Sequence, residues 1–253
     1  MAPGPAVGGR IDVLELDGPI RRAMGHAAWG KDPARRFTDY KAIARELDEY
    51  LVLVGREFPE TAFHLLVNFP NWGWRGAPDY HARGQDRMNW GDYHAALSAV
   101  LPITQAEAPK FSVLTIDHPY GYATGQTPSR NAEARKTDWP ARIADLCDVA
   151  RSHGLQCALI LNDEQGGKKS DQAFADGTLA YAKLVRDRGL RFEHLIVQSW
   201  YPHPEEVVGD KLPAQMAVAA ETSRLFAGVG DKPPAQPLPV KPPTSTRDVA
   251  DRP

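Results

Sequence analysis

Five apolar segments of this chain each end in side chains that could take part in chemistry. The clearest case is the apolar run 157–161, which is followed by Asn-Asp-Glu at 162–164 and by two glycines at 166–167 where the backbone can turn. The polar and aromatic residues at the five ends are Glu15 and Asp17; Asn68, Asn71 and Trp72; Asp117, His118 and Tyr120; Asn162, Asp163 and Glu164; and Gln198, Trp200 and Tyr201. Because chemistry in α/β folds sits at the carboxyl ends of parallel strands, we expect these groups to share one rim.

The residue types at these ends suit a carbohydrate. Aromatic rings can stack on the apolar face of a sugar ring, and amides and carboxylates can bind its hydroxyl groups. Cleavage of a glycosidic bond also needs two carboxyl groups facing each other across the bond. The predicted catalytic residues are Glu164, Asp117, Asp17 and Asp163. The predicted substrate-binding residues are Trp72, Asn71, His118, Tyr120, Asn162, Gln198, Trp200 and Tyr201.

Strand patterns alternate with helix patterns five times along the chain. Strands are predicted at 11–17, 63–69, 111–117, 157–162 and 192–201, and helices at about 38–56, 91–106, 138–153, 170–188 and 205–227. Such alternation predicts βαβ units with parallel strands as neighbours in chain order and helices on the outer face. An open doubly wound sheet and a (β/α)-barrel both fit this pattern. The first strand lacks a Gly-x-Gly-x-x-Gly loop, and no Walker motif occurs, which favours a TIM-barrel-like repeat.

Three regions are predicted along the chain. Residues 1–10 are expected to be a flexible lead, residues 11–230 a barrel-like domain, and residues 231–253, with seven prolines in 23 positions, a disordered tail. Only five βα units are visible, so we expect a partial barrel whose opening strands are missing.

By architecture, residues 11–227 resemble the (β/α)₈ glycoside hydrolases, without a strict sequence signature. In the large retaining clan of that superfamily the acid/base follows the fourth strand, the nucleophile the seventh, and an aromatic residue the eighth. Counting back from the last helix, the resemblance implies that Trp200 follows the eighth strand, Glu164 the seventh and Asp17 the fourth. The family usually has Asn-Glu after its fourth strand, whereas this chain has Glu-Leu-Asp-Gly at 15–18.

Two other functions remain open. A metal-dependent barrel enzyme, of the sugar isomerase or amidohydrolase type, could draw ligands from Glu15, Asp117, His118, Asp163 or Glu164, and His203. No tight metal-binding spacing occurs, so no metal or cofactor is predicted. A degenerate barrel could also bind carbohydrate without turning it over.

Composition and sequence patterns limit the binding partners and the cellular location that we expect for this chain. The net charge is −2 and no basic block occurs, so a nucleic-acid partner is not expected. No apolar run reaches the ~20 residues that span a bilayer, and residues 1–10 lack the features of a signal peptide. The chain as given is therefore expected to be soluble and cytoplasmic, or secreted if its start is truncated. The two cysteines, Cys147 and Cys157, predict buried thiols and no disulfide framework.

Overall fold

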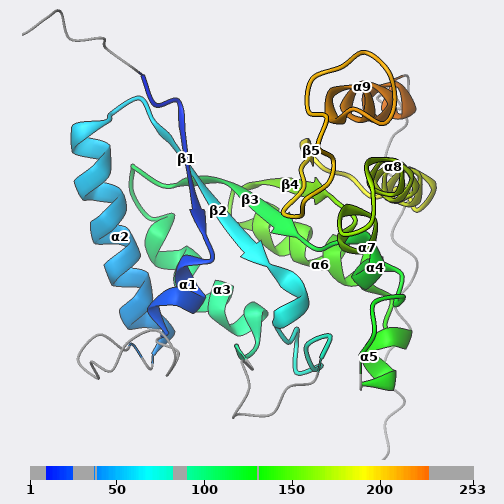
Figure 1. Ribbon diagram of the computed structural model, residues 1–253. Helices are drawn as coiled ribbons and strands as arrows, with labels where there is room; N and C mark the ends of the chain where they lie inside the picture. The colour runs from blue at the N-terminus through cyan, green and yellow to red at the C-terminus, as the bar shows by residue number, and fades with distance from the viewer. Residues whose placement is uncertain (1–9, 25–36, 38, 82–89, 130, 228–253) are drawn as a thin grey trace, which may run out of the picture.

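The computed structural model describes residues 10–24, 37, 39–81, 90–129 and 131–227 (Figure 1). Its centre is a five-stranded, all-parallel sheet in the order β1-β2-β3-β4-β5. The strands are β1 (Val13–Asp17), β2 (Ala62–Asn68), β3 (Phe111–Asp117), β4 (Gln156–Leu161) and β5 (His194–Val197). The prediction of an α/β repeat with parallel strands adjacent in chain order is confirmed. The predicted tail at 231–253, and all of the predicted lead except residue 10, lie outside the described residues.

The long helices follow the strands as the apolar spacing predicted. They are α2 (Tyr40–Glu57), α3 (Tyr93–Thr104), α6 (Trp139–Ser152) and α8 (Asp171–Asp187), each within three residues of its predicted bounds. Each begins at a side chain that accepts a hydrogen bond from a backbone N–H of the first turn, at Asp39, Asp92, Asp138 and Ser170. Loss of such a cap costs about 1 kcal/mol of stability.

Two predicted bounds near the end of the domain were wrong. The last helix, α9 (Gln215–Phe226), begins ten residues later than the predicted 205. Pro213 disfavours helical backbone at the residue before it, so a helix from 205 could not continue through this point. The strand predicted at 192–201 is limited to His194–Val197, because β4 offers partners only as far as Leu161, which pairs with Val197.

Five short elements escaped the sequence analysis. They are α1 (Pro19–Ala23), the 3₁₀ turn η2 (Phe69–Asn71), α4 (Tyr120–Ala123), α5 (Ala132–Lys136) and α7 (Glu164–Gly167). All have five residues or fewer, which is too short for a helical period to be read from the sequence. Four of them start within three residues of a strand end, so they shape the carboxyl edge of the sheet.

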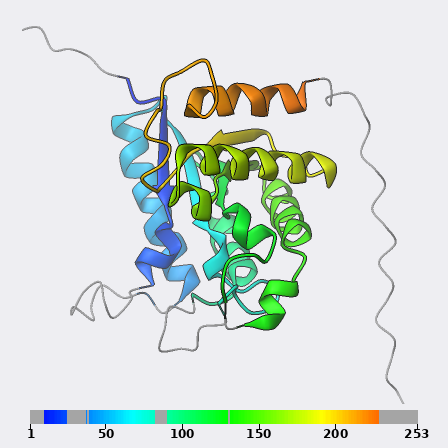
Figure 2. The ribbon, with the colours of Figure 1, turned by 45° about the vertical axis from the view of Figure 1, so that its right-hand side comes forward.

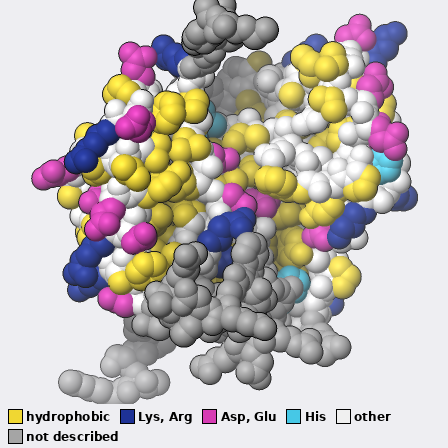
Figure 3. Space-filling model, turned by 60° about the vertical axis from the view of Figure 1, so that its left-hand side comes forward, with side chains coloured by type: hydrophobic (Ala, Val, Ile, Leu, Met, Phe, Trp, Pro, Cys, Tyr) yellow, Lys and Arg dark blue, Asp and Glu magenta, His cyan; other side chains and the backbone are white. Residues whose placement is uncertain are grey.

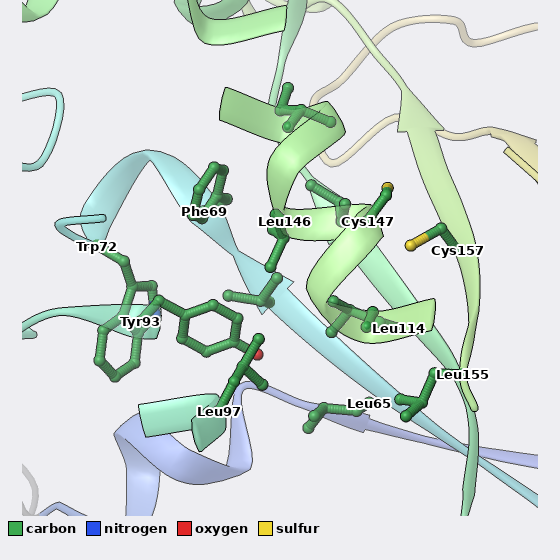
Figure 4. Packing of buried hydrophobic residues seen from close by; sticks show 14 of the residues in the cluster. Leu65, Phe69, Trp72, Tyr93, Leu97, Leu114, Leu146, Cys147, Leu155 and Cys157 are labelled. Carbon is green, nitrogen blue, oxygen red and sulfur yellow. The ribbon is translucent and has the colours of Figure 1, made fainter. Parts of the chain in front are cut away.

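The apolar core lies between one face of the sheet and the helices. Alternate strand residues such as Leu65, Leu159 and Leu161 join side chains of α2, α3, α6 and α8 in one buried cluster. The close-up shows this layer around α6, with Cys147 on the helix and Cys157 on β4 (Figure 4). Both thiols are buried and free, as predicted.

The opposite face of the sheet is concave. The Thr115 hydroxyl on β3 donates a hydrogen bond to Glu15 Oε1 on β1 at 2.5 Å, although β2 lies between these strands. His64 on β2 and His194 on β5, which are separated by β3 and β4, also interact electrostatically. Burial is the main cause of the lowered pKa of His64, Glu15 opposes it, and His194 lowers it further. Since neighbouring strands are ~4.8 Å apart, side chains from non-adjacent strands can interact in this way when the sheet curls toward them.

The last two long helices close one side of the molecule. Figure 2 shows α9 lying along α8, next to β5. No helix within the described ranges is both long and apolar enough to cross a membrane.

The position of each strand in the sheet predicts its resistance to amide exchange. β2, β3 and β4 each pair on both sides, whereas β1 and β5 each pair with one strand among the described residues. We expect amides of β2, β3 and β4 to exchange only on global unfolding and those of β1 and β5 to exchange faster through local opening. Native-state hydrogen exchange read by mass spectrometry measures this order. Equal protection across all five strands would contradict it.

Candidate active site at the carboxyl edge of the sheet

Asp117 is the centre of the polar groups at the carboxyl edge. It is the last residue of β3, it is paired in register with Asn68 of β2, and its exposed fraction is 6%. Asn68 Nδ2 donates to Asp117 Oδ2 at 2.9 Å, and Asn162 Nδ2, from just after β4, donates to Asp117 Oδ1 at 3.2 Å. Three neighbouring strands thus place one carboxyl group between two amides.

This group of three is tied into the turns around it. Asn71 Nδ2 donates to Asn68 Oδ1, which links the 3₁₀ turn after β2 to the site. The backbone N–H of Tyr120 donates to the Asn162 carbonyl at 3.0 Å, which links the end of β3 to the end of β4. The predicted site residues Asn71, Asp117, Tyr120 and Asn162 therefore lie together.

The electrostatic surroundings of Asp117 favour its neutral form. Burial is the main reason that its pKa is raised to about 6; the charges of Asp17 and Glu164 add to this effect, and the hydrogen bonds from the two asparagines oppose it. A carboxyl group with such a pKa changes its charge close to neutral pH, as proton-transferring groups in enzymes do.

Asp163 has a structural role at the same edge. Its side chain caps α7, accepting from the backbone N–H groups of Gln165 at 3.3 Å and Gly166 at 3.0 Å. Burial is the largest influence on its pKa, which is raised, and these backbone bonds counter part of that effect. With both oxygens engaged by the backbone, Asp163 orients the turn that carries Glu164.

Glu164 is the first residue of α7, and its carboxylate is close enough to Asp117 to influence the pKa of that group. Its side chain is 15% exposed and pairs with the Lys168 ammonium, with Nζ and Oε1 2.5 Å apart. Lys168 Nζ also lies 5.1 Å from the centre of the Tyr201 ring. Burial and the nearby charges of Glu164, Asp117 and Asp163 raise the pKa of Tyr201, so its hydroxyl keeps its proton. Tyr201 therefore belongs to the same group of side chains.

The segment that follows β5 brings Tyr201 to this position. The backbone N–H of His203 donates to the Gly167 carbonyl at 3.0 Å, and His203 Nδ1 lies 2.6 Å from Asp171 Oδ1 at the start of α8. Asp171 also accepts the backbone N–H groups of Glu205 and Glu206, and these bonds, with the one to His203, hold its pKa below its usual value. These hydrogen bonds attach residues 199–206 to the end of α7 and to the start of α8.

Asp17 approaches the site from β1. Its side chain is 56% exposed and pairs with Arg22 of α1 at 2.5 Å. The charge of Asp17 nevertheless raises the pKa of Asp117. In the space-filling view of this side of the molecule, acidic and basic side chains meet near the centre of the face (Figure 3).

The structure does not bring every predicted residue to this group. Trp72 is buried between Trp90 and Tyr93, with ring centres 5.7 and 5.0 Å away, in the layer beneath the sheet (Figure 4). His118 is fully buried against Trp139, and burial lowers its pKa to about 3. Both side chains pack against rings of the aromatic core, and neither takes part in the hydrogen bonds that join Asn68, Asp117 and Asn162.

The remaining predicted aromatic and amide residues lie nearer the surface. Tyr120 is half-buried with its ring 5.8 Å from that of Tyr181, and Gln198 is half-buried just after β5. Trp200 is 54% exposed, which leaves one side of its ring open to solvent.

The candidate metal ligands named from the sequence are not gathered into one site. His118 is in the core and His203 pairs with Asp171. Within the described part of the chain, no group of three or more His, Cys, Asp and Glu side chains is placed to hold a metal ion.

Two residues of the site were not among the predicted site residues. Asn68 is the last residue of β2; its position at a strand end was recognised from the sequence, but it was not predicted to bind substrate. Lys168 is the second of these residues. The signal for Lys168 was its spacing of four residues from Glu164, which places the two side chains on one face of a helical turn.

The cap at Asp163 predicts that Gly177 of α8 cannot be enlarged. A Cβ atom at Gly177 would lie 2.1 Å from Asp163 Oδ2 and 2.6 Å from its Cβ. We expect Gly177→Ala to destabilise the fold by about 1–3 kcal/mol through overpacking, although alanine is the better helix former by ~1 kcal/mol. Urea unfolding measures the change, with exposed Lys183→Ala on the same helix as the control. A Gly177→Ala protein as stable as the wild type would contradict the close packing.

The raised pKa of Asp117 predicts a pH-dependent contribution to stability. The group titrates near pH 6 in the folded chain, against an ordinary value of 3.8. As the pH rises from about 4 to about 6, the unfolded chain loses this proton before the folded chain does. The folded state therefore loses about 2–3 kcal/mol of stability over this range and nothing further above it. Denaturant unfolding of the wild type and Asp117→Asn at several pH values measures the effect: the difference between them should change over this range and be flat above pH 7. A pH-independent difference would show that Asp117 titrates normally.

Comparison of the chain with protein-family models, with curated proteins and with solved structures finds no match in any of the three. The assignment of the site therefore depends on its geometry and electrostatics.

Proposed function

We propose that this protein is a glycoside hydrolase of the (β/α)-barrel type, with the sheet forming an arc of the barrel and Asp117 and Glu164 as its catalytic pair. One observation carries the proposal: the two carboxyl groups follow adjacent strands and have different environments. Asp117 is buried with a pKa of about 6, and Glu164 is partly exposed and paired with a lysine. A buried carboxyl group with a raised pKa beside a second carboxylate is the arrangement that glycosidic cleavage uses.

The environments suggest one role for each group. In this mechanism Asp117 donates its proton to the glycosidic oxygen as the bond from that oxygen to the sugar carbon breaks. Each of its oxygens accepts one amide N–H and has a second lone pair that can carry the proton. The Glu164 carboxylate faces the sugar carbon and either attacks it or takes a proton from the attacking water. If Glu164 attacks, Asp117 recovers its proton from the water molecule that then hydrolyses the bond between the sugar and Glu164; if Glu164 acts as the base, Asp117 takes a proton from solvent and Glu164 releases one.

The substrate would be bound by the groups around this pair. Tyr201 offers a neutral hydroxyl next to Glu164, and Trp200 offers an exposed aromatic ring two residues after Gln198. Rings with one face in solvent can stack on sugars, whereas a buried ring such as that of Trp72 cannot.

A second candidate is carbohydrate binding without turnover. The observation that favours it is the 2.5 Å ion pair between Glu164 and Lys168, because a carboxylate neutralised in this way is a poorer nucleophile or base. In that case the same rim would hold a sugar, and no bond would be cleaved.

Glu164→Gln tests the proposed function. This change keeps the shape of the side chain and removes its charge, so we expect turnover of any cleaved glycoside to fall by about 10²–10⁴-fold with little change in stability. The measurement is release of chromophore from a panel of aryl glycosides, followed by reducing-end assays on oligosaccharides.

Glu133→Gln is the matched control, because Glu133 also pairs with a lysine, Lys136, but on the remote helix α5. Wild-type turnover in Glu164→Gln would end the assignment of Glu164. If no glycoside is cleaved but one is bound in calorimetric titration, the binding function is correct and the enzymatic one is wrong.

A further inference from the structure

We propose that Asn68 and Asn162 are positioning residues that hold the Asp117 carboxyl group in one orientation at the centre of the candidate site. Their effect on the reaction depends on the proposed function. Their effect on the proton affinity of Asp117 does not, and it can be measured without a substrate.

The geometry of the three side chains supports this assignment. Each amide donates to a different oxygen of the same carboxyl group, from Asn68 at 2.9 Å and from Asn162 at 3.2 Å. The donors come from opposite sides, β2 and β4, while Asp117 ends the strand between them. A rotation of the carboxyl group would break both hydrogen bonds together, so the pair fixes its plane as well as its position.

The Asn68 amide is itself held in place. Asn71 Nδ2 donates to Asn68 Oδ1, so the oxygen of that amide faces Asn71 and its nitrogen must face Asp117. Asn68 is also in register with Asp117 along paired strands. Asn71 therefore contacts Asn68 and makes no hydrogen bond to Asp117 in the described structure.

Asn162 is held differently. It is fully buried, and its Oδ1 has no hydrogen-bond partner among the described residues. A buried amide oxygen without a partner costs stability, and the hydrogen bond from Nδ2 to Asp117 is the compensating contact that the side chain makes. The hydrogen bond to Asp117 therefore sets the orientation of the Asn162 side chain.

The amides also oppose the other influences on Asp117. Burial and the carboxylates of Asp17 and Glu164 favour the neutral form, whereas each amide N–H favours the ionised form. Without the amides the pKa of Asp117 would be higher. The asparagines thus bring Asp117 to a proton affinity at which donation and recovery of a proton are both possible.

The test is the titration of Asp117 in the full-length protein. The signal is the carbonyl stretch of its protonated carboxyl group in infrared difference spectra recorded against pH, identified by its loss in Asp117→Asn. We expect Asn68→Leu and Asn162→Leu, which keep the side-chain volume and remove the donor, each to move the midpoint upward by about one pH unit. Asn71→Ala, which removes the outer amide alone, should move it by less than half of that.

Unchanged midpoints in both leucine variants would overturn the proposal, as would a shift in Asn71→Ala equal to theirs. If a leucine variant does not fold, Asn68→Ala and Asn162→Ala, which remove the donor and add no apolar bulk, should still shift the midpoint upward. The absence of a shift in folded alanine variants would count against the proposal in the same way.

Activity separates this proposal from the function on which it builds. If Asp117 is the acid, the alkaline limb of the pH profile of kcat/KM should move upward with the infrared midpoint, and kcat should fall more than KM changes. If the midpoint moves but the wild type cleaves no glycoside, the positioning role stands and the hydrolase function fails. If glycosides are cleaved and the midpoint moves while the alkaline limb stays fixed, Asp117 is not the acid in the reaction.

Discussion

The burial of one carboxyl group at the end of the central strand constrains everything around it. Asp117 is almost completely removed from water, and an ionised carboxylate in that position is costly unless donors surround it. The two asparagines supply those donors because parallel strands in register place residues of neighbouring strands at the same height. The amides compensate only partly, since the pKa stays at about 6. The site therefore holds a group between its two charge states.

The same constraint explains why the turns beyond the strands are closely packed. α7 is a single turn, too short to be stable alone, and it is held by the Asp163 cap and by α8, where only a glycine fits opposite that cap. This turn places Glu164 near Asp117, and Gly167 accepts the N–H that brings Tyr201 over Lys168. Each contact is small, but together they fix two carboxyl groups from different strands relative to each other.

The sequence predicted the parallel repeat and the common location of Asp117, Asn162 and Glu164, because the carboxyl ends of parallel strands lie at the same edge of a sheet. It did not separate Trp72 and His118 from the rim. His118 directly follows β3 and Trp72 follows the 3₁₀ turn after β2, yet both side chains turn toward the helices and join the aromatic core. The direction in which each of these side chains points is set by the backbone angles of a short turn such as η2. Such turns have no periodic sequence pattern from which the direction could be predicted. The role of Asp163 as a cap was missed for the same reason, since α7 itself was not predicted.

Lys168 has two opposing effects on the candidate site. A lysine 2.5 Å from Glu164 weakens that carboxylate as a nucleophile, yet it also places a positive charge beside a site where the charges of Asp17 and Glu164 raise the pKa of Asp117. Without a nearby cation, three carboxyl groups at one rim would share protons and lose their separate roles. The lysine is 52% exposed, so water screens the pair and a bound substrate could compete for the ammonium. The ion pair is thus compatible with catalysis when substrate displaces Lys168, and with binding alone when it does not.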